Sequence, residues 1–561
     1  MSVLIVSPPR SGSSLVAQLL ESGGFTSDKV DINKVNINPS SFNKNGYNED
    51  VCFTLLNDQL IKCLYGENFS FIYAPKSLRI KFFFENNNFT NLEKIIPEKY
   101  KYDINEKTIF LPNNYEKHIK KYTGLEWDVW GLTRMQEKGK WYKEISEFLG
   151  VNKCLLVNSG SSANLIAISA LTSHKFDSKK INPGDEVITV AAGFPTTVAP
   201  IIQVGAVPVF IDADTITGNA NCDQLEKAYN PKKTKAVMMA HALGNPFNLT
   251  KTLEFCRKYD LWLIEDNCDA LGCSYSMPKS LANSLGFFKN SPGLDDGPNK
   301  VIRWTGTWGD ISTQSFYPPH HLTMGEGGSV NIINSRKLSV IAESFRDWGR
   351  DCWCPSGVDN TCKKRFDWQL GELPRGYDHK YTYSHLGFNL KPLDIQAAIG
   401  RVQLKRLPEF IEKRKQNWNY LRSGLSKSEK FLEFALPTHA TEWDISKGFS
   451  WDNTNCQSDC SWFGFKISTK KNSPFTRTEL AKELDNNKIG NRMLFGGNLL
   501  RQPAFIELQK SNPNAYRIAV ETVGSDEIMN NTLFLGTYPG LTKTMMDFEI
   551  ETINNFIGKF H

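Results

Sequence analysis

The sequence predicts an α/β protein: a large domain whose parallel sheet carries helices on both faces, followed by a smaller C-terminal α/β domain. From about residue 140, short apolar runs rich in Val, Ile and Leu alternate with helical runs. Small and polar residues follow several of these runs, at the positions where a parallel sheet binds its ligands. The length of 561 residues is sufficient for two or three domains.

An N-terminal extension precedes this pattern. Residues 1–25 predict a strand, a Pro/Gly/Ser-rich loop and a helix, whereas residues 26–125 are rich in Asn, Lys and aromatic residues and have weak periodicity. We therefore expect an N-terminal segment, a large domain and a small domain, with the boundaries 1–105, 125–400 and 401–561.

The large domain begins with strands and helices in strict alternation. The strands are expected at 153–158, 185–190, 207–212, 235–241 and 261–266, and the helices at 163–171, 196–205 and 252–260. Residues 276–302 are rich in turn-forming residues, which predicts a surface insertion. A long helix is expected over 400–425, leading into the small domain.

The composition excludes several classes of protein. A net charge of +6 is small for this length, so no electrostatic case exists for nucleic-acid binding. No apolar stretch approaches the roughly 18–20 residues of a membrane span, and the first residues lack the basic region of a signal peptide. We therefore expect a cytoplasmic protein whose twelve cysteines are reduced.

Two segments suggest a phosphorylated, charged ring as ligand. Residues 158–165, NSGSSANL, follow a strand and open a helix, so the amides of Gly160 and Ser161 are candidate phosphate ligands. Turns of this kind are also common in purely structural roles. Asp266 ends an apolar strand, where a buried carboxylate needs a partner such as a protonated pyridine nitrogen. A helix-capping aspartate is the alternative.

Further candidates lie close to these positions. Phe194, in AAGFPTT, can lie flat on a ring or be an ordinary core residue. Asp269 follows Asp266 by three residues and is taken as a further cofactor ligand. Ser315 and Tyr317 lie on the path to the adjacent pair His320 and His321.

Together these segments resemble the DegT/DnrJ/EryC1/StrS sugar aminotransferase family of fold-type I pyridoxal-phosphate enzymes, from about residue 125 to the end. The resemblance implies an aspartate aminotransferase-like fold with a mixed, mainly parallel sheet. It implies that Gly160, Ser161 and Ser315 hold the phosphate, Asp266 the pyridine nitrogen and Phe194 the ring face. The segment 387–400, GFNLKPLDIQAAIG, implies that Asn389 reaches the phosphate of a neighbouring subunit in a homodimer with shared active sites.

The lysine that tethers the cofactor in such aminotransferases has no counterpart in this sequence. Counting six residues back from Glu326 of GEGG leads to His320, and His321 is adjacent. An imidazole cannot form the covalent link of a lysine, but it moves protons near neutral pH. The cofactor is therefore expected to be held non-covalently and to persist as pyridoxamine phosphate. A structural histidine on a lysine-less relic is the alternative.

Three stretches of the sequence resemble the 3-dehydrases of dideoxysugar biosynthesis within this family. They are PPHHLTMGEGG, RGYDHKYTYSHLGFNLKPLDIQAA and RMLFGGNLLRQPAF. This implies removal of the C3 hydroxyl from a CDP-linked 4-keto-6-deoxyhexose on the route to 3,6-dideoxyhexoses of O-antigen lipopolysaccharide. His320 would move a proton at the cofactor. Two electrons would come from an NAD(P)H-dependent flavin iron–sulfur reductase.

The cysteines suggest an electron path. Cys352, Cys354 and Cys362 supply three thiolates from one loop, and a cluster held by cysteines alone needs a fourth. The resemblance implies a 2Fe-2S cluster with Cys268, next to Asp266, as the fourth ligand. Cys273 competes for that role, and a structural zinc also takes four thiolates. The pair Cys456 and Cys460 is expected to be incidental.

The substrate diphosphate calls for arginines, which bind phosphate in a fork geometry. Arg492 and Arg501 are the candidates, with Asn498 between them and Tyr317 on the cofactor side. Three residues in the matched segment are also expected to line the pocket: His379, Lys380 and His385.

Residues 6–25, VSPPRSGSSLVAQLLESGGF, resemble the phosphosulfate-binding loop of sulfotransferases, with Arg10 as a phosphate ligand. About 100 residues are too few for that whole fold, so we expect a truncated docking module. Two other functions stay open. One is a dehydrase without a cluster that regenerates its cofactor from glutamate; the other is a protein whose active part is the N-terminal module.

Overall fold

The computed structural model describes residues 136–295, 297–354 and 360–560, together with four short strands between Phe69 and Phe110. The chain divides into two compact units, Met1–Val129 and Trp130–His561. The predicted strand, loop and helix at 1–25, with Arg10, lie outside the described residues.

The N-terminal unit contains an antiparallel sheet of four strands in the order β1-β2-β4-β3. Phe69 lies opposite Phe84 in the β1–β2 pair. The sequence pattern of residues 26–125 did not predict these strands. Their bounds are β1 Phe69–Ala74, β2 Arg79–Phe84, β3 Tyr102–Asp103 and β4 Thr108–Phe110.

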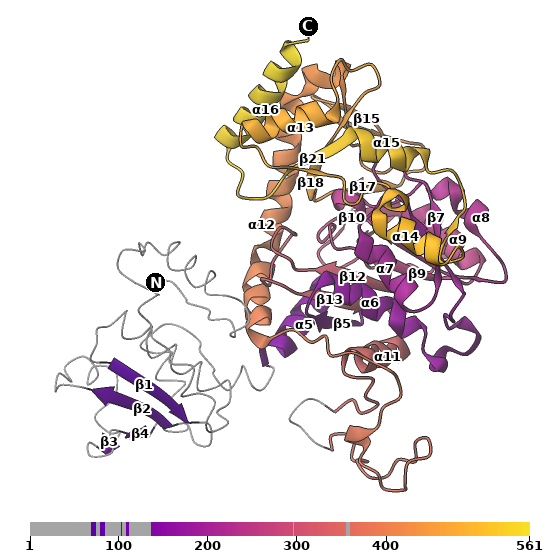
Figure 1. The fold of residues 1–561 in the computed structure, drawn as a ribbon, viewed down its shortest axis with the longest axis vertical. Helices are drawn as coiled ribbons and strands as arrows, with labels where there is room; N and C mark the ends of the chain where they lie inside the picture. The colour runs from indigo at the N-terminus through magenta and orange to yellow at the C-terminus, as the bar shows by residue number, and fades with distance from the viewer. Residues whose placement is uncertain are drawn as a thin grey trace. The chain divides into compact units, whose positions relative to one another are not determined.

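The second unit is built on an eight-stranded sheet in the order β20-β7-β6-β8-β9-β12-β13-β5 (Figure 1). Strand β13 is antiparallel to its two neighbours, and the other pairs are parallel. This confirms the mixed, mainly parallel sheet. The bounds are β5 Lys153–Val157, β6 Glu186–Val190, β7 Val207–Ile211, β8 Thr234–Ala240, β9 Trp262–Asp266, β12 Ile311–Ser315, β13 Gly328–Ile332 and β20 Arg517–Ile518.

Helices cover both faces of this sheet, as the run of apolar residues in each strand predicted. Successive strand residues point to opposite faces, so Val187 packs in the core cluster under α6, α7 and α11, and Ile188 in the cluster under α9. The helix bounds are α5 Gln136–Leu149, α6 Gly160–Leu171, α7 Pro195–Gln203, α8 Leu225–Ala228, α9 Leu249–Lys258 and α11 Arg336–Arg346.

The small domain is a four-stranded antiparallel sheet in the order β14-β18-β21-β19 with helices packed on it. Helix α12 (Asp394–Gly424) runs into it from the large domain in Figure 1, so the predicted boundary at 400/401 falls inside one helix. The remaining bounds are β14 Leu432–Phe434, β18 Gly464–Thr469, β19 Asn491–Met493, β21 Thr532–Gly536, α13 Arg477–Asn486, α14 Pro503–Ser511, α15 Val523–Asn531 and α16 Lys543–Gly558.

The segment 276–302 is not simply a surface insertion, and this corrects the prediction. Strand β10 (Ser274–Pro278) pairs with β11 (Lys300–Trp304) and with β17 (Gln457–Asp459), and α10 (Lys279–Ser284) follows β10. Met277 and Val301 are buried in the large core cluster. Turn composition did not mark Met277 and Val301 as core residues, because they pack on segments that are distant in the sequence.

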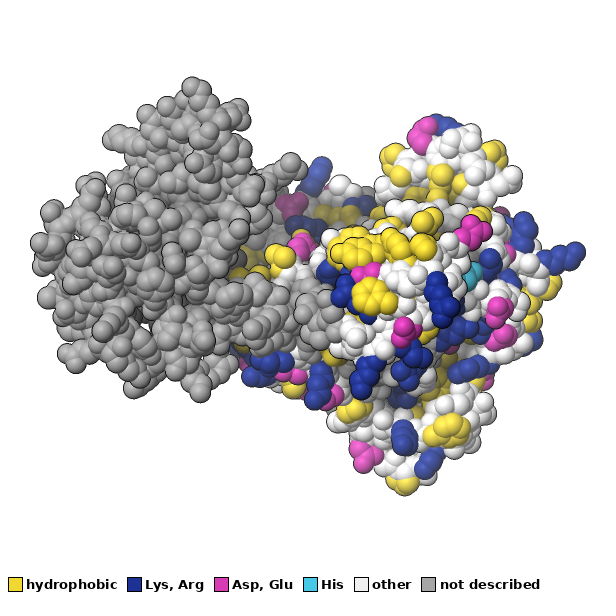
Figure 2. All heavy atoms as spheres, turned by 90° about the horizontal axis from the view of Figure 1, so that it is seen from below, with side chains coloured by type: hydrophobic (Ala, Val, Ile, Leu, Met, Phe, Trp, Pro, Cys, Tyr) yellow, Lys and Arg dark blue, Asp and Glu magenta, His cyan; other side chains and the backbone are white. Residues whose placement is uncertain are grey.

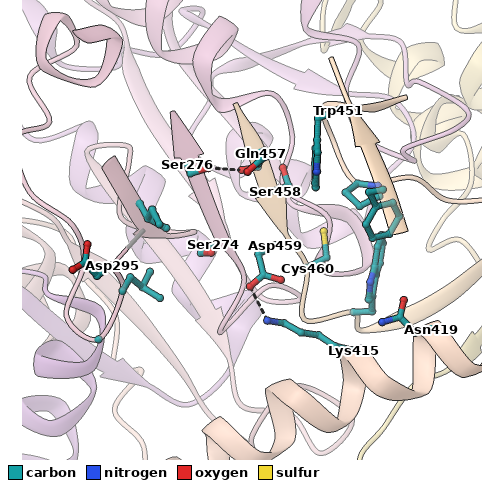
Figure 3. Close-up of a pocket in the computed structure, with 16 residues that line it drawn as sticks. Ser274, Ser276, Asp295, Lys415, Asn419, Trp451, Gln457, Ser458, Asp459 and Cys460 are labelled. Carbon is teal, nitrogen blue, oxygen red and sulfur yellow. Dashed lines mark hydrogen bonds and ion pairs between the residues drawn. The ribbon is translucent and has the colours of Figure 1, made fainter. Parts of the chain in front are cut away.

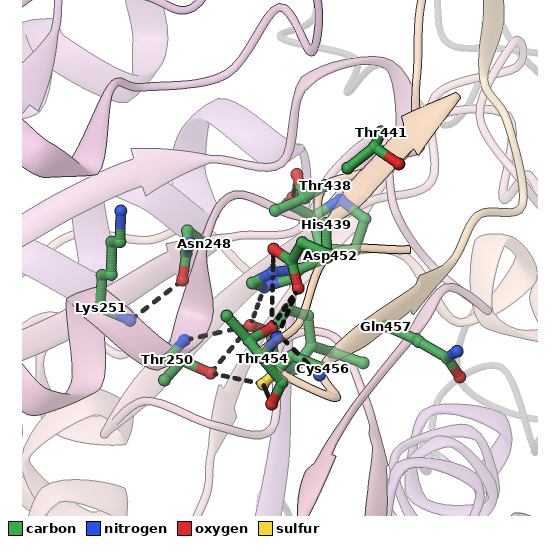
Figure 4. A network of polar contacts seen from close by, with 12 residues as sticks. Asn248, Thr250, Lys251, Thr438, His439, Thr441, Asp452, Thr454, Cys456 and Gln457 are labelled. Atoms are coloured by element: carbon green, nitrogen blue, oxygen red, sulfur yellow. Dashed lines mark hydrogen bonds and ion pairs between the residues drawn. The ribbon is translucent and has the colours of Figure 1, made fainter. Parts of the chain in front are cut away.

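A buried polar network fixes the β15–β16 hairpin (Ala440–Asp444 and Gly448–Trp451) against this region (Figure 4). Tyr275 Oη lies 2.6 Å from His439 Nε2, and His439 Nδ1 lies 2.9 Å from Asp452 Oδ2. Thr250 Oγ1 lies 2.9 Å from Tyr275 Oη and 3.4 Å from Cys456 Sγ. Cys456 therefore packs in a structural network. No helix in the described residues is long and apolar enough to cross a membrane.

Candidate active site

The start of α6 provides a seat for a phosphate. Ser159 caps the helix by accepting a hydrogen bond from the Ser162 amide. Within the described residues, the amides of Gly160 and Ser161 donate to no protein atom, so both can bind an anion at the positive end of the helix dipole. A Cβ at Gly160 would lie 2.6 Å from Ser315 Cβ, which requires glycine and brings Ser315 to this seat.

Asp266 is a buried carboxylate without a cation. Its Oδ2 accepts hydrogen bonds from Asn164 Nδ2 at 2.8 Å and Thr197 Oγ1 at 2.7 Å. No ion pair to Asp266 is present among the described residues. The chain after it forms turns instead of a helix, so the helix-capping interpretation does not apply. A buried, uncompensated carboxylate suits the N–H of a protonated pyridine ring.

Phe194 immediately precedes α7 and leaves half of its side chain exposed, at 50%. Its ring packs edge-on against Phe495 at 6.4 Å between centroids. An ordinary core phenylalanine would be fully covered, so this exposure agrees better with a ring face that receives a flat ligand.

The two adjacent histidines lie in different environments. His320 Nε2 lies 3.3 Å from Asp269 Oδ1, and its ring contacts those of Tyr317 and Phe463. His321 is buried, and its Nε2 is hydrogen bonded to the carbonyl oxygen of Ser461. Burial lowers the pKa of His321 well below the ordinary value, so that imidazole is neutral.

These contacts distinguish the roles of the two histidines. His320 is beside a carboxylate that can orient its ring, as in carboxylate–histidine pairs generally. Asp269, predicted as a cofactor ligand, instead contacts His320. Tyr317 is half exposed beside it, and Ser315 Oγ accepts a hydrogen bond from the Tyr317 amide at 3.3 Å.

The residues at this edge of the sheet fit pyridoxal or pyridoxamine phosphate. They combine free amides at a helix start, a buried carboxylate, a half-exposed aromatic ring and a histidine–aspartate pair. All of them lie at the carboxyl ends of parallel strands or in the loops that follow, where such sheets bind ligands. The loop between β12 and β13 contains His320 and His321 and no lysine.

The predicted substrate residues differ in their exposure and in their hydrogen-bond partners. Arg492 is exposed on the short strand β19, and its Nη1 donates to the Asn491 carbonyl at 2.7 Å. Asn498 is fully buried and donates to Thr522 and Asp526. Arg501 is paired with the same Asp526, with Nη2 and Oδ2 2.7 Å apart. The structure thus gives Asn498 a structural role and leaves Arg492 the more accessible cation.

The segment 492–499 nevertheless lies close to the cofactor residues. The Gly496 amide donates to the Gly193 carbonyl and the Leu499 amide to the Ala191 carbonyl. This pairing places the small domain against the loop that carries Phe194. Long-range pairing of this kind has no signal in the local sequence.

Other predicted pocket residues lie at the far end of α6. His379 Nε2 lies 2.8 Å from Asp351 Oδ1, and His385 lies between the hydroxyls of Ser173 and Ser344. Burial lowers the pKa of His385 to about 4. Lys380 belongs to the same segment and is half-buried. None of these contacts involves the phosphate seat.

Asn389 lies in a segment that runs close to the phosphate seat. It is exposed, and its Oδ1 accepts a hydrogen bond from Lys391 Nζ at 2.6 Å. The next carbonyl, of Leu390, accepts from the amide of Asn158, directly before the Ser159 cap. The Asn389 side chain is therefore accessible close to the start of α6.

The three loop cysteines lie together, because Cys354 interacts with the thiols of both Cys352 and Cys362. Burial opposes ionisation of Cys354, but hydrogen bonds from Thr361 and the Cys362 backbone lower its pKa to about 6. Reactive thiolates have such environments.

The predicted fourth ligand lies elsewhere. A Cβ at Gly160, at the start of α6, would lie 3.2 Å from Cys268 Sγ. The loop lies beside the other end of α6, where Lys175 Nζ is 3.2 Å from Asp351 Oδ2. The twelve residues of α6 separate the Cys268 side chain from this loop, and a helix of that length spans about 18 Å.

Cys268 therefore lies by the start of α6, whereas the loop of Cys352 and Cys354 lies by its end. No group of three or more His, Cys, Asp or Glu residues in the part that the structure describes is arranged to hold a metal ion. Cys273 does not supply the missing ligand, since it is buried with its Sγ 3.0 Å from the Gly244 carbonyl. The same separation applies to the ligands of a four-thiolate zinc.

Comparisons with known proteins agree with this architecture. Residues 116–553 match the model of the DegT/DnrJ/EryC1/StrS aminotransferase family. The chain is 49% identical over 431 residues to the lipopolysaccharide biosynthesis protein RfbH of Salmonella typhimurium, covering 77% of this chain and 87% of that protein. It is 45% identical over 416 residues to dTDP-4-dehydro-2,6-dideoxy-D-glucose 3-dehydratase of Saccharopolyspora spinosa, covering 74% and 79%.

A solved structure shares the fold. The crystal structure of a GDP-4-keto-6-deoxymannose-3-dehydratase variant with bound GDP-perosamine superposes with a TM-score of 0.58, at 24% identity. The match covers 76% of this chain and 98% of the other. The fold-type I architecture expected from the sequence is thereby confirmed. None of these comparisons shows a sulfotransferase-like N-terminal segment.

Proposed function

Because this chain belongs to the DegT/DnrJ/EryC1/StrS aminotransferase family, we propose that it is a pyridoxamine-phosphate-dependent 3-dehydratase of a nucleotide-linked 4-keto-6-deoxyhexose. The observation that carries the proposal is the His320–Asp269 pair at the position of the tethering lysine. Relatives at 45% and 29% identity are named as 3-dehydratases of 4-keto-deoxysugar nucleotides. Dideoxysugar synthesis for lipopolysaccharide, in the cytoplasm, is part of the proposal.

Bound pyridoxamine phosphate would supply an amine for the C4 ketone of the sugar and a ring that accepts electrons. The amides of Gly160 and Ser161 and the hydroxyl of Ser315 hold the phosphate. Asp266 keeps the pyridine nitrogen protonated, since an ion pair in a buried site favours the charged form. Phe194 covers one face of the ring.

His320 moves the proton in this proposal. With Nε2–H directed at Asp269, Nδ1 carries the basic lone pair, and it has no hydrogen-bond partner among the described residues. His321 is unsuited to the task because it is buried and bonded to a backbone carbonyl. Without an amine at this position, exchange of the amino group is no longer favoured over loss of the C3 hydroxyl.

The nucleotide that we propose is CDP. Relatives are named with dTDP and GDP sugars, so the sugar chemistry is better supported than the base. Arg492 is the proposed diphosphate ligand because it is exposed, and Arg501 can join it only by exchanging its partner Asp526. Tyr317, half exposed beside His320, is placed to contact the sugar.

We propose that the active form is a homodimer in which Asn389 reaches the phosphate of the partner. Exposed hydrophobic side chains accumulate in the segment 348–393. Figure 2 shows one face of the molecule on which hydrophobic side chains lie among Lys and Arg side chains. The most exposed in the segment 348–393 are Leu386, Leu393, Tyr381 and Phe366. Surfaces of this kind are typical of subunit interfaces.

Two alternative proposals account for the source of the two electrons. The loop of Cys352, Cys354 and Cys362 favours an iron–sulfur enzyme served by a flavin reductase, whereas the distance to Cys268 favours a cluster-free enzyme that uses glutamate. Iron and acid-labile sulfide in anaerobically purified protein distinguish them. Two irons per chain, lost in Cys354→Ser, would support the 2Fe-2S version.

The central test is the state of the cofactor. Mass analysis should find pyridoxamine or pyridoxal phosphate released on denaturation, and borohydride should leave the mass of the chain unchanged. His320→Lys should abolish C3 deoxygenation and make the cofactor trappable by borohydride. Irreversible trapping on the unmutated chain would refute the proposal.

A further inference from the structure

A cavity of about 420 Å³ lies apart from the candidate active site, and none of the cofactor residues lines it (Figure 3). It is enclosed by the β10–β11–β17 sheet, helix α12 and the β15–β16 hairpin. This volume is within the roughly 300–1,000 Å³ of small-molecule sites. The segment 276–302 contributes one side, and the cofactor chemistry makes no use of it.

One wall of the cavity is aromatic. Trp462, Phe449 and Trp451 line it, and Trp418 stacks behind Trp462 at 4.8 Å with the planes 10° apart. The centroids of Phe449 and Trp451 lie 5.9 Å apart. The His439–Asp452 network of Figure 4 anchors the hairpin that carries these two rings. The wall is therefore held in place before a ligand arrives.

The opposite wall carries polar side chains from two strands. Ser274 and Ser276 of β10 line it, and Asp459 of β17, which pairs with Ser274, projects from the same face of the sheet. Ser274 and Ser276 are 5% and 6% exposed. Ser458 pairs with the buried Tyr275, so its side chain points to the other face, into the core.

Charge at the cavity excludes phosphorylated ligands. Lys415 is the sole cation among the residues that line it, and its Nζ is 2.6 Å from Asp459 Oδ2. Asp295 lies at the rim in Figure 3. With two carboxylates and one paired ammonium, the cavity offers no free cation to a diphosphate. A nucleotide sugar therefore does not match it.

We propose that this cavity binds an uncharged saccharide, with the C–H face of one hexose ring against Trp451 and Trp462 and its hydroxyls on Ser274, Ser276 and Asp459. A pyranose has an apolar face and a polar edge, which matches an aromatic wall opposite hydroxyls and a carboxylate. The site is separate from the proposed dehydratase site, and its ligand carries no nucleotide.

Ligand-observed saturation-transfer NMR on the full-length protein with its cofactor tests this proposal. The probe is methyl α-D-glucopyranoside, and choline serves as the cationic competitor. Saturable binding is expected with a Kd on the order of 1 mM. Trp451→Ala should weaken it by about tenfold or more, and Ser274→Ala by roughly threefold to tenfold.

Matched variants make the outcome decisive. Trp353→Ala removes a half-exposed tryptophan that does not line the cavity and should leave binding unchanged. Circular dichroism verifies that each variant is folded, and dehydratase activity should survive Trp451→Ala. Three results would overturn the proposal: no saturable sugar binding, sugar binding that survives Trp451→Ala but is lost in His320→Asn, or binding of choline in place of the sugar. None of these depends on whether the dehydratase proposal holds.

Discussion

The two ends of helix α6 carry similar residue types but have different organisation. At its N-terminal end, residues from three separate segments surround one seat: Gly160, Asp266, and Ser315 with His320. At its C-terminal end, Asp351, His379 and the three cysteines come from one continuous loop and mainly contact each other. Each end has a histidine beside an aspartate, yet only the first combines that pair with free helix amides. The residue types therefore do not identify the reacting site. The position of the residues on the sheet does.

The largest expected difference between the two ends is in catalysis. His320→Asn should lower the dehydratase kcat by roughly 10²–10⁴-fold, the usual loss on removing a general base. His379→Asn, which also removes an imidazole paired with an aspartate, should change kcat by less than about threefold. Steady-state rates with the 4-keto-sugar nucleotide measure both. Equal losses in the two variants would contradict the assignment.

His321 provides a control within the same loop. His321→Asn removes a buried hydrogen bond to the Ser461 carbonyl and should cost about 1–3 kcal/mol of unfolding free energy. The rate per folded molecule should be nearly unchanged. A normal stability with a lost rate would instead make His321 the base.

The second expected difference is in cofactor binding. Asp266→Asn removes the buried charge opposite the pyridinium, and breaking such a pair costs about 3–5 kcal/mol, or about 10²–10⁴-fold in affinity. Asp351→Asn, at the other end, should destabilise the cysteine loop and leave cofactor affinity intact. Titration of the apoprotein followed by absorbance distinguishes the two. Cofactor binding insensitive to Asp266→Asn would refute the cofactor site.

A smaller effect tests the packing at the helix start. Gly160→Ala puts a Cβ 2.6 Å from Ser315 Cβ and should cost about 1–3 kcal/mol in stability, with weaker phosphate binding. Adding Ser315→Gly should restore part of the stability but not the binding. Gly558→Ala meets no atom within 4 Å and should be neutral or slightly stabilising. Thermal unfolding of the set measures this.

The smallest effect concerns the cysteine end. With its pKa at about 6, Cys354 is mostly thiolate at pH 7 and loses that form as the pH falls below 6. Its alkylation rate by iodoacetamide should therefore fall about tenfold between pH 7 and pH 5. Cys268 should not react, because burial raises its thiol pKa well above the ordinary value. Peptide mass mapping follows both sites.

Much of the large domain could be predicted from the sequence, because its strands and helices alternate as uninterrupted apolar runs. The strands predicted at 153–158 and 261–266 are β5 and β9 to within a residue or two. The segment 276–302 was misjudged, because pairing of β10 with β17, across about 180 residues, buries side chains that local turn composition does not mark.

The features of the candidate site also fall into two groups: those that local sequence patterns predict and those that depend on tertiary contacts. The phosphate seat and Asp266 follow from local patterns at strand ends. The partner of His320, the burial of His321 and the commitment of Asn498 to Thr522 and Asp526 depend on contacts between distant segments. The family resemblance grouped Cys268 with the cysteine loop, whereas in the structure Cys268 lies by the start of α6 and the loop by its end.

The individual strands of the large domain, the helix start at Gly160 and the absence of a lysine between β12 and β13 follow from the sequence, since each depends on neighbours along the chain. The order of the strands in the sheet, the partners and burial of the two histidines, and the cavity beside β10 and β17 were decided only by the tertiary structure. The physical reason is that burial, pairing and desolvation are set by atoms brought together from far apart in the chain, and a linear pattern does not record those distances.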